Sequence, residues 1–161
     1  MFRSMRRFNQ QLSDEESTNI LLNGKTGILG VIGEMGYPYT VPLNYVYSNH
    51  KIYFHTAKEG HKIDAIKQCD KVSFCVVDKD DVVSEKLTSY YRSVIVFGKA
   101  KILESKEEIF NAAKLIGIKY CDDKEKISKE IKKFENVLSC VEITIENITG
   151  KEAVELRKNK K

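Results

Sequence analysis

The sequence predicts a mainly β domain of the α+β class, in which a small antiparallel β-barrel carries peripheral helices. Two close turns, Met35-Gly36 and residues 48–50, each join a pair of strand-like segments. Connections this short place strands side by side and antiparallel, because a parallel pair needs a crossover of roughly a dozen residues or more. The helical patterns come mostly after these hairpins, and neither a GxGxxG nor a P-loop motif occurs. The barrel is therefore favoured over a doubly wound α/β fold.

Length and composition indicate one domain. The 161 residues fit a single core, and 42% of them are apolar, which is enough to fill it. We expect one domain over residues 1–161, with basic, flexible ends near residues 1–8 and 155–161. The net charge of +4 is mild and gathers at these ends, without the interleaved aromatics of a nucleic-acid surface. No apolar run suits a membrane helix and no secretory signal is present, so we expect a cytoplasmic protein with neither membrane nor nucleic-acid partner.

The first half of the chain is expected to hold two short helices around three strands. Ser13-Asp-Glu-Glu16 has the form of a capping box, in which the serine and the glutamate satisfy first-turn amides reciprocally. Ile63 and Ile66 recur at helical spacing. The expected elements are a helix that begins after residue 13 and stops at Gly24, strands at residues 26–32, 37–47 and 51–55, and a helix at residues 60–68.

The second half is expected to hold two strands, two helices and a final strand. The charged segment Asp78-Lys-Asp-Asp81 interrupts a run of β-branched residues and indicates a solvated loop. Gly98 is expected to bend the longest strand, and Ser105-Lys-Glu-Glu108 is a second capping box. The expected elements are strands at residues 71–77 and 89–103 with a loop at 78–86 between them, helices that begin at residues 105 and 123, and a strand at residues 137–145.

The four cysteines are expected to be free thiols. Cys69, Cys75, Cys121 and Cys140 form no CxxC pair, and no histidine lies at ligand spacing to any of them. A disulfide framework also does not suit a cytosolic domain of this size. We therefore expect no metal site.

The first segment that could bind a ligand is Tyr39-Thr-Val-Pro-Leu-Asn44. Pro42 lies inside a strand pattern, and proline, which has no N–H, is confined to strand edges, strand starts and bulges. Unpaired backbone groups between Thr40 and Asn44 could therefore hydrogen-bond the rim of a planar heterocycle. The alternative is that Pro42 only protects an edge strand from aggregation.

The second segment is YFHTAKEGHKID, residues 53–64. His55 and Thr56 end a strand, Gly60 precedes a short helix, and Lys62 falls in the first turn of that helix. Free amides, the positive end of a helix dipole and a lysine charge together suit a phosphate group. The alternative is an ordinary surface lysine beside a packed or exposed histidine.

The third segment is Arg92-Ser93, which opens the apolar stretch at residues 94–97. A guanidinium and a hydroxyl at a strand start could add phosphate contacts, although a routine strand entry has the same pattern. No GxSxG elbow, HExxH motif or CxxC pair offers another catalytic arrangement.

Five segments carry a family resemblance: MRRFNQQLSDEE near the start, then GYPYTVPLNYVY, KIYFHTAKEGHKIDAIKQCDKVSF, YRSVIVFGKAKIL and finally ITGKEA. In this order they resemble the pyridoxamine 5′-phosphate oxidase-like FMN-binding split-barrel proteins, and most closely their nitroimidazole-resistance (NimA-like) branch. The resemblance covers nearly the whole chain. Its most specific part is the combination YPYTVPLNY…IYFHTAKEGHKID.

The resemblance implies a six-stranded antiparallel split β-barrel that forms a homodimer, with FMN in the groove between the subunits. Backbone groups of the edge strand would line the flavin ring, Lys62 would hold the phosphate, and Ser93 would reach the cofactor of its own chain or of its partner. His55 matches a histidine of the nitroimidazole-resistance proteins proposed to act near the substrate, which makes it the candidate catalytic residue. The cofactor-binding residues so implied are Thr40, Val41, Pro42, Leu43, Asn44, His55, Thr56, His61, Lys62, Arg92 and Ser93.

The chain departs from the oxidases at two of these positions. They usually have Arg-Lys where this chain has His61-Lys62, so one fixed phosphate charge is missing, and a histidine replaces it only in part. The glutamine of their long strand is Ser93 here, and their C-terminal substrate-binding arginine pattern is not found. Vitamin B6 oxidation is therefore not expected.

The function implied is that of an FMN-dependent oxidoreductase, which passes electrons from a reduced donor to a small acceptor. The flavin carries the redox chemistry and the protein positions it, with a nitro-aromatic compound as one candidate acceptor. One alternative is a flavin-binding or electron-storage module without a substrate. Another is a split barrel that binds a deazaflavin, or haem with His55 or His61 as axial ligand.

Overall fold

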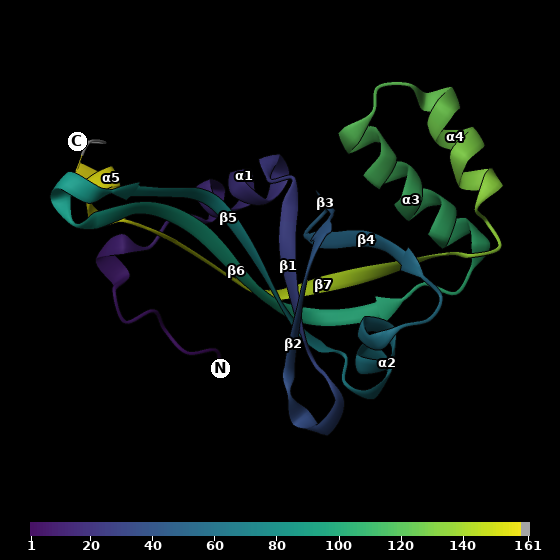
Figure 1. The fold of residues 1–161 in the computed structure, drawn as a ribbon, viewed down its shortest axis with the longest axis horizontal. Coiled ribbons are helices and arrows are strands. Elements are labelled where there is room, and N and C mark those ends of the chain that lie inside the picture. Colours follow the sequence, from purple (N-terminus) through teal and green to yellow (C-terminus); the bar gives the residue numbers. More distant parts are fainter. Residues whose placement is uncertain (159–161) are drawn as a thin grey trace.

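One antiparallel sheet forms the body of the protein, whose computed structural model describes residues 1–158 (Figure 1). Its strands are β1 (Thr26–Ile32), β2 (Pro38–Asn44), β3 (Val46–Ser48), β4 (Lys51–Ala57), β5 (Lys71–Val83), β6 (Thr88–Ile102) and β7 (Leu138–Glu152). They lie in the order β2-β1-β5-β6-β7-β4-β3. The predicted mainly β split-barrel class is confirmed. The sheet has seven strands where six were expected, because the predicted strand at residues 37–47 is divided at Tyr45.

The division at Tyr45 closes the sheet on itself. β2 and β3 stand at opposite ends of the strand order, yet only one residue separates them in the chain. β2 pairs with β1, and β3 pairs with β4, so residues 38–48 join the two ends of the sheet. A sheet joined in this way curls into a barrel, and the barrel is split where β2 and β4 diverge without pairing.

Tyr45 is fixed from two helices, α1 (Asp14–Asn23) and α3 (Lys106–Tyr120). Its side chain is fully buried, and its hydroxyl donates to the carbonyl of Leu21 at 2.8 Å. Its N–H donates to the Tyr120 hydroxyl at 3.1 Å, and the Lys119 ammonium lies 4.1 Å from the centre of its ring. A Cβ at Gly24 would lie 2.6 Å from the Tyr45 hydroxyl. The residue after α1 is therefore a glycine, because a side chain there would clash with Tyr45.

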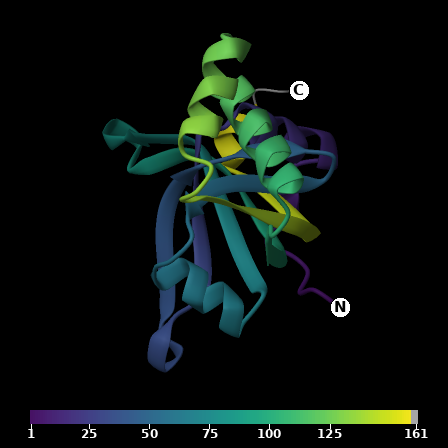
Figure 2. The same cartoon turned by 90° about the vertical axis from the view of Figure 1, so that its right-hand side faces the viewer.

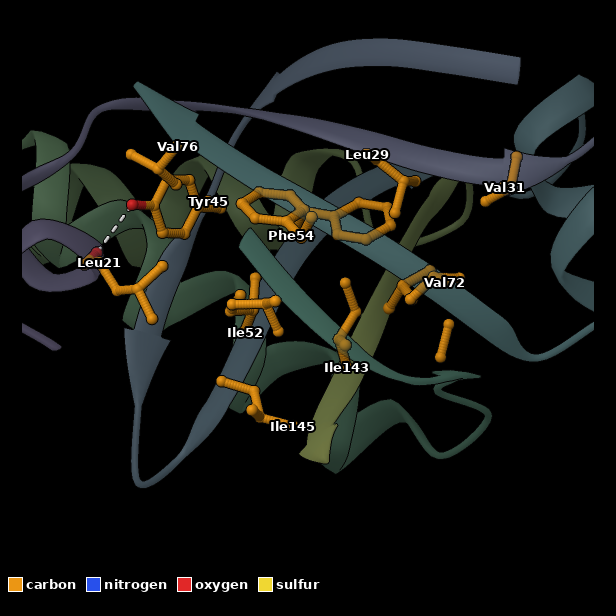
Figure 3. Close-up of a cluster of buried hydrophobic side chains, with 14 of the residues drawn as sticks. Leu21, Leu29, Val31, Tyr45, Ile52, Phe54, Val72, Val76, Ile143 and Ile145 are labelled. Carbon is orange, nitrogen blue, oxygen red and sulfur yellow. Dashed lines mark hydrogen bonds between the residues drawn. The ribbon is translucent and has the colours of Figure 1, made fainter. Parts of the chain in front are cut away.

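Large apolar side chains fill the barrel (Figure 3). Phe54, Phe74 and Leu29 are fully buried, and the rings of Tyr45 and Phe74 meet edge to face with centres 5.0 Å apart. A smaller cluster outside the barrel includes Cys140 and packs α3 against β7. The core of this protein is therefore the barrel interior, with one external cluster beneath a helix.

Helices approach the end of β4 from two sides. The remaining helices are α2 (His61–Gln68), α4 (Lys124–Lys133) and α5 (Val154–Lys158), with short 3-10 turns η1 (Phe8–Gln10), η2 (Glu34–Gly36) and η3 (Ser84–Lys86). Figures 1 and 2 agree that α3 and α4 lie on one side of β4 while α2 lies on the other. Among residues 1–158, no helix has the length and apolar character that crossing a bilayer requires.

Two strands run further than predicted. Residues 78–83 continue β5 and pair with residues 88–92 as a projecting hairpin arm, so the predicted loop at residues 78–86 is wrong. None of residues 78–83 is buried, so this part of the strand lacks the apolar alternation that signals a strand. β7 continues to Glu152, whereas the predicted strand ended at residue 145. The prediction stopped early because a bulge at Glu146, opposite Phe97 and Gly98, interrupts the alternation of side chains.

One of the two predicted capping boxes is complete. The capping box of Ser13 and Glu16 is present on α1, whereas on α3 the Ser105 hydroxyl accepts from the Glu108 amide and donates to its carboxylate. The ladder between β6 and β7 shifts register at Gly98, where a bend of β6 was predicted. All four cysteines are free, and residues 1–158 contain no metal-binding group of histidine, cysteine and carboxylate side chains. Of the predicted flexible C-terminal end, residues 154–158 form α5, while residues 159–161 lie outside the described residues.

We expect the contribution of Lys119 to stability to increase between about pH 8 and 10.5, opposite in sign to that of the buried Cys140 thiol, whose pKa burial raises. Burial lowers the pKa of this lysine from its usual 10.5 to about 8. The unfolded chain therefore binds the extra proton in this window, and ∂ΔG/∂pH of unfolding is positive. Urea denaturation across this pH range gives the slope of the free energy of unfolding against pH. This slope should be less positive for Lys119→Met than for the native protein. Lys114→Met, at an exposed position of the same helix, is the control, and identical slopes in all three proteins would contradict the assignment.

Candidate functional site

The split between β2 and β4 exposes two free strand edges. β2 begins the strand order, so only β1 pairs with it. β3 pairs with β4 no further than Tyr53, so residues 54–57 pair with β7 alone. The two edges diverge from Tyr45, and α2 lies in the angle between them in both views (Figures 1 and 2). We call this wedge the split.

The backbone of β2 is oriented by Pro42. Pro42 stands opposite Ile28 in a ladder without a bulge. Because proline has no N–H for the ladder and backbone direction alternates along a strand, Pro42 must turn its nitrogen away from β1. The N–H and C=O groups of Thr40 and Asn44 then also point away from β1. The predicted edge position of Pro42 is confirmed, and the side chains of Val41 and Leu43 pack against the core.

The end of β4 presents His55 and Thr56 on opposite faces. His55 is exposed on the outer face of the barrel, opposite Cys140 in the ladder. Thr56 points inward and is 6% exposed, and its hydroxyl has no hydrogen-bond partner within residues 1–158. A buried hydroxyl without a partner costs about 1–3 kcal/mol, so this one is available to a ligand.

α2 begins inside the split. Gly60 caps it with φ +125°, a backbone conformation that favours glycine. The His61 ring stacks on Tyr39 of β2 with ring centres 4.1 Å apart. Its Nε2 would lie 2.8 Å from a Cβ at Gly33, so this glycine leaves the space that the imidazole occupies. The start of α2 is therefore held against β2.

Lys62 is the cation at this helix start. It is half-buried, and no hydrogen bond or ion pair involves its ammonium group among the residues that the structure describes. Gly60 O already accepts from the amides of Ile63 and Asp64, which leaves the amides of His61 and Lys62 unbonded in the first turn. Two free amides, the helix dipole and an unpaired ammonium favour an anion here.

The structure brings the first two predicted segments together and keeps the third apart. Ser93 pairs with Lys151 of β7, whereas His55 pairs with Cys140 of the same strand. Eleven residues of extended chain separate these two positions, a path of about 36 Å along β7. Ser93 and His55 of one chain therefore do not meet at one small ligand.

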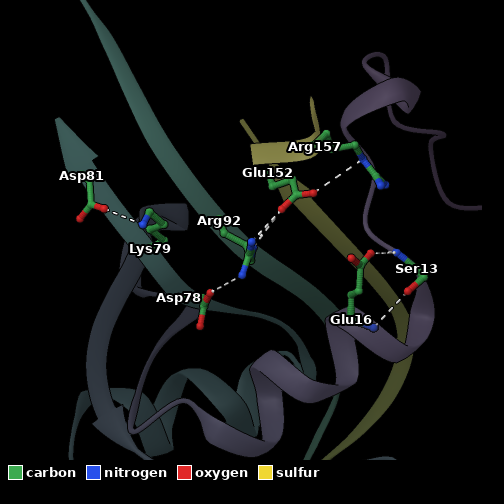
Figure 4. A network of polar contacts seen from close by, with 8 residues as sticks. All are labelled: Ser13, Glu16, Asp78, Lys79, Asp81, Arg92, Glu152 and Arg157. Atoms are coloured by element: carbon green, nitrogen blue, oxygen red, sulfur yellow. Dashed lines mark hydrogen bonds and ion pairs between the residues drawn. The ribbon is translucent and has the colours of Figure 1, made fainter. Parts of the chain in front are cut away.

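Arg92 belongs to a polar cluster at the far end of β7 (Figure 4). Its Nε and Nη2 atoms each lie 3.0 Å from one oxygen of Glu152, and its Nη1 lies 3.4 Å from Asp78. Glu152 is fully buried, and Arg157 of α5 approaches its other oxygen at 3.8 Å. The Arg92 guanidinium thus neutralises a buried carboxylate, and the sequence analysis missed Glu152 because only the tertiary fold buries it.

Ser93 lies on an apolar outer face of the sheet. Side chains of β1, β5 and β6 that point away from the barrel core form this face, and five of them are large, apolar and 40–52% exposed. They are Ile28, Ile32, Val77, Ile95 and Phe97. The face continues to Pro42 at the edge of the split, and Phe2 stacks on Phe97 at 5.8 Å. We call these five side chains the outer apolar face.

Two site features escaped the sequence analysis. Tyr39 stacks on His61, and Gly33 makes room for that ring. Tyr39 stands in the segment already singled out, but its role depends on where α2 docks. A glycine at the end of β1 carries no signal of its own.

Comparison with known proteins places the chain among relatives of one fold. A family model described as pyridoxamine 5′-phosphate oxidase matches residues 13–152. No curated protein matches the chain. Similar solved structures include a candidate 5-nitroimidazole antibiotic resistance protein from Bacteroides thetaiotaomicron, with 22% identity, a TM-score of 0.73, and coverage of 88% of this chain and 86% of that chain.

Two further structures are similar. The conserved hypothetical protein Rv2991 from Mycobacterium tuberculosis has 20% identity and a TM-score of 0.80, over 92% of this chain and 90% of that chain. An FAD-binding protein from Mesorhizobium loti has 25% identity and a TM-score of 0.64, over 89% of this chain and 97% of that chain. The first two likenesses, under 25% identity, establish the shared fold.

We expect Arg92→Met to lower the free energy of unfolding by about 3 kcal/mol, because it removes the donors of a buried carboxylate. Urea denaturation measures the loss. Lys79→Met is the control, since its pair with Asp81 is exposed and is worth about 0.5 kcal/mol. A loss no larger than that of the control would contradict the structural role of Arg92.

Proposed function

The chain belongs to the pyridoxamine 5′-phosphate oxidase family, and from this premise we propose that it is an oxidoreductase that binds FMN in the split. The observation that carries the proposal is the meeting of the free β2 edge with the start of α2, where the Lys62 ammonium has no hydrogen-bond or ion-pair partner among residues 1–158. The FAD-binding protein from Mesorhizobium loti supports a flavin on this fold.

The residues of the split match the parts of FMN. Lys62 and the two free amides of α2 would hold the phosphate. The backbone groups of Thr40 and Asn44 would bond the polar rim of the ring. The unpartnered hydroxyl of Thr56 would bond the ribityl chain. Each assignment satisfies a polar group that the protein alone leaves unsatisfied, so the residues present fit the cofactor.

The bound flavin supplies the redox chemistry, accepting electrons from a reduced donor and passing them to an acceptor. The chain binds it, orients it and excludes water from it. His55 stands next to Thr56 on the same strand, which makes it the candidate for holding a proton beside the reaction. With His61 in place of a second fixed cation and Ser93 in place of the glutamine, vitamin B6 oxidation remains outside this proposal.

A homodimer would complete the site. The outer apolar face is larger than scattered surface residues explain, and such patches mark interaction surfaces. In the sheet, Ile95 of β6 lies in a row with Cys75 of β5, Ile28 of β1 and Pro42 of β2. Ser93 lies two residues from Ile95 along β6, on the same face of the sheet. Within one chain, Ser93 lies too far from the split to contact a cofactor bound there. If two copies associate through this face, Ser93 of the partner subunit would reach that cofactor.

Spectroscopy and turnover test the function. The purified protein should show flavin bands in the visible spectrum, and the extracted cofactor should have the mass of FMN. Oxidation of NADH or NADPH with a panel of acceptors, nitro-aromatics included, should then exceed that of free flavin. Bound flavin without turnover would favour the storage module, and a Soret band would favour haem. A protein that stays colourless after FMN is added would refute the proposal.

We expect Lys62→Ala to weaken FMN binding by about tenfold or more, which corresponds to roughly 1.4 kcal/mol or more. The variant loses the one ammonium at the start of α2. Fluorescence titration of the apoprotein with FMN measures the Kd. Lys58→Ala, at an exposed position just before α2, should bind within about twofold of the native protein. Equal affinity in the two variants would refute the phosphate role.

We expect Ile95→Asp to convert the homodimer to a monomer, because it places a charge at the centre of the outer apolar face. Size-exclusion chromatography with light scattering measures the mass. Leu115→Asp is the control, since Leu115 on α3 is 38% exposed, close to the 42% of Ile95, and lies off this face. A native protein that is monomeric at micromolar concentration would contradict the dimer.

A further inference from the structure

A cavity of about 570 Å³ lies on the side of β4 away from α2. Its walls come from α3, α4, the segment that follows α4, and the ends of β4 and β7. Small-molecule sites typically measure about 300–1,000 Å³. The cavity is thus of the right size for a small organic ligand, and it adjoins the split at the end of β4.

The cavity lies between α3 and α4, which are in contact at one end and move apart toward the other. α3 and α4 touch at Gly117, where a Cβ would lie 2.6 Å from a methyl group of Ile127. From this contact the apolar lining becomes steadily more open, since Ile127 is 7% exposed, Phe134 44% and Val137 59%. Apolar side chains that face each other across a gap, without filling it, leave room for an apolar guest.

The polar groups of the lining indicate a neutral ligand. Lys126 and Glu130, the two charged residues of α4 that line the cavity, stand one turn apart, are both exposed and have opposite charges that cancel. His55 enters from β4, and within residues 1–158 no hydrogen bond or ion pair occupies its ring. The hydrogen-bonding groups of His55 and Thr56 at one end of a mostly apolar wall suit a ring compound with a polar substituent.

The cavity and the split share the end of β4. Side chains alternate along a strand, so His55 and Thr56 point to opposite faces of β4, yet both line the cavity at the strand end. Thr56, whose buried hydroxyl has no hydrogen-bond partner within residues 1–158, is therefore shared by the cavity and the split. We propose that the cavity binds the electron acceptor of the proposed oxidoreductase, a neutral and mostly apolar ring compound whose polar group meets His55. The inference rests on the proposed function, because the acceptor needs the flavin on the neighbouring face.

Binding is tested with the flavin-loaded protein and the neutral planar dye Nile red. Ile131→Trp fills the cavity from α4 and should weaken dye binding by about tenfold or more, while flavin content is unchanged. Lys129→Trp, on the exposed side of the same helix, should bind within about twofold of the native protein. Val137→Asp places a charge at the open end of the cavity and should also weaken dye binding. It tests the same inference if Ile131→Trp does not fold. Equal affinity in all variants would overturn the inference.

Electron transfer is tested with duroquinone, a neutral ring acceptor. Two electrons and two protons convert it to the hydroquinone, and the flavin, first reduced by light with EDTA, returns to its oxidised form. Reoxidation by limiting duroquinone should slow by about tenfold in Ile131→Trp, whereas reoxidation by ferricyanide, an inorganic anion, should not change. Equal slowing with both acceptors, or none with duroquinone, would refute the acceptor role.

The two proposals fail in different ways. A protein that binds no flavin but still loses Nile red affinity in Ile131→Trp would refute the proposed function and leave the cavity as a binding site. A flavin-loaded protein whose dye affinity ignores Ile131→Trp would refute the cavity alone. Protection of Cys121, which lines the cavity, from N-ethylmaleimide by the dye locates the bound molecule independently, and unprotected Cys121 counts against the cavity.

Discussion

The burial of Tyr45 is the constraint on which the rest of this structure depends. One residue separates the two strands that end the sheet, and that residue carries a fully buried aromatic ring bonded to α1 and α3. Because the ring is pinned, the chain must pair with β1 before it and with β4 after it. The barrel closes at this point and cannot close beyond it. The split is thus a consequence of barrel closure at Tyr45, and the edges of β2 and β4 diverge from that point.

The two free edges at the split are stable because of what flanks them. Unpaired strand edges invite aggregation, and natural proteins blunt them with proline or cover them with helices. β2 carries Pro42, and α2 begins against it through His61 and Tyr39. These same features present an ordered set of backbone groups beside Lys62, whose ammonium has no hydrogen-bond or ion-pair partner among residues 1–158. Edge protection by Pro42, the alternative that the sequence left open, is therefore compatible with the proposed ligand binding on the same strand.

Local patterns predicted most of the elements, whereas their assembly depended on contacts distant in sequence. The capping box at Ser13 and the turn at Met35-Gly36 are encoded by neighbours, and both are confirmed. The break at Tyr45 depends on Tyr120, 75 residues away, so the run from 37 to 47 looked like one strand. The charged arm after Asp78 is held by its cross-strand partners and not by burial. The distance between Ser93 and His55 needed the register of β7, which no periodicity reveals.

The histidine that replaces the oxidases' arginine has a structural reason at this position. His61 is stacked on Tyr39 and fits the space left by Gly33, so its ring braces α2 against β2. An arginine there would trade this planar contact for a longer side chain and a fixed charge. The first turn of α2 then carries one permanent cation, Lys62, beside the amides of His61 and Lys62 that the turn itself leaves unbonded. For the proposed flavin site this would mean less charge beside the phosphate and a firmer brace, so that the cofactor would be held more by geometry than by charge.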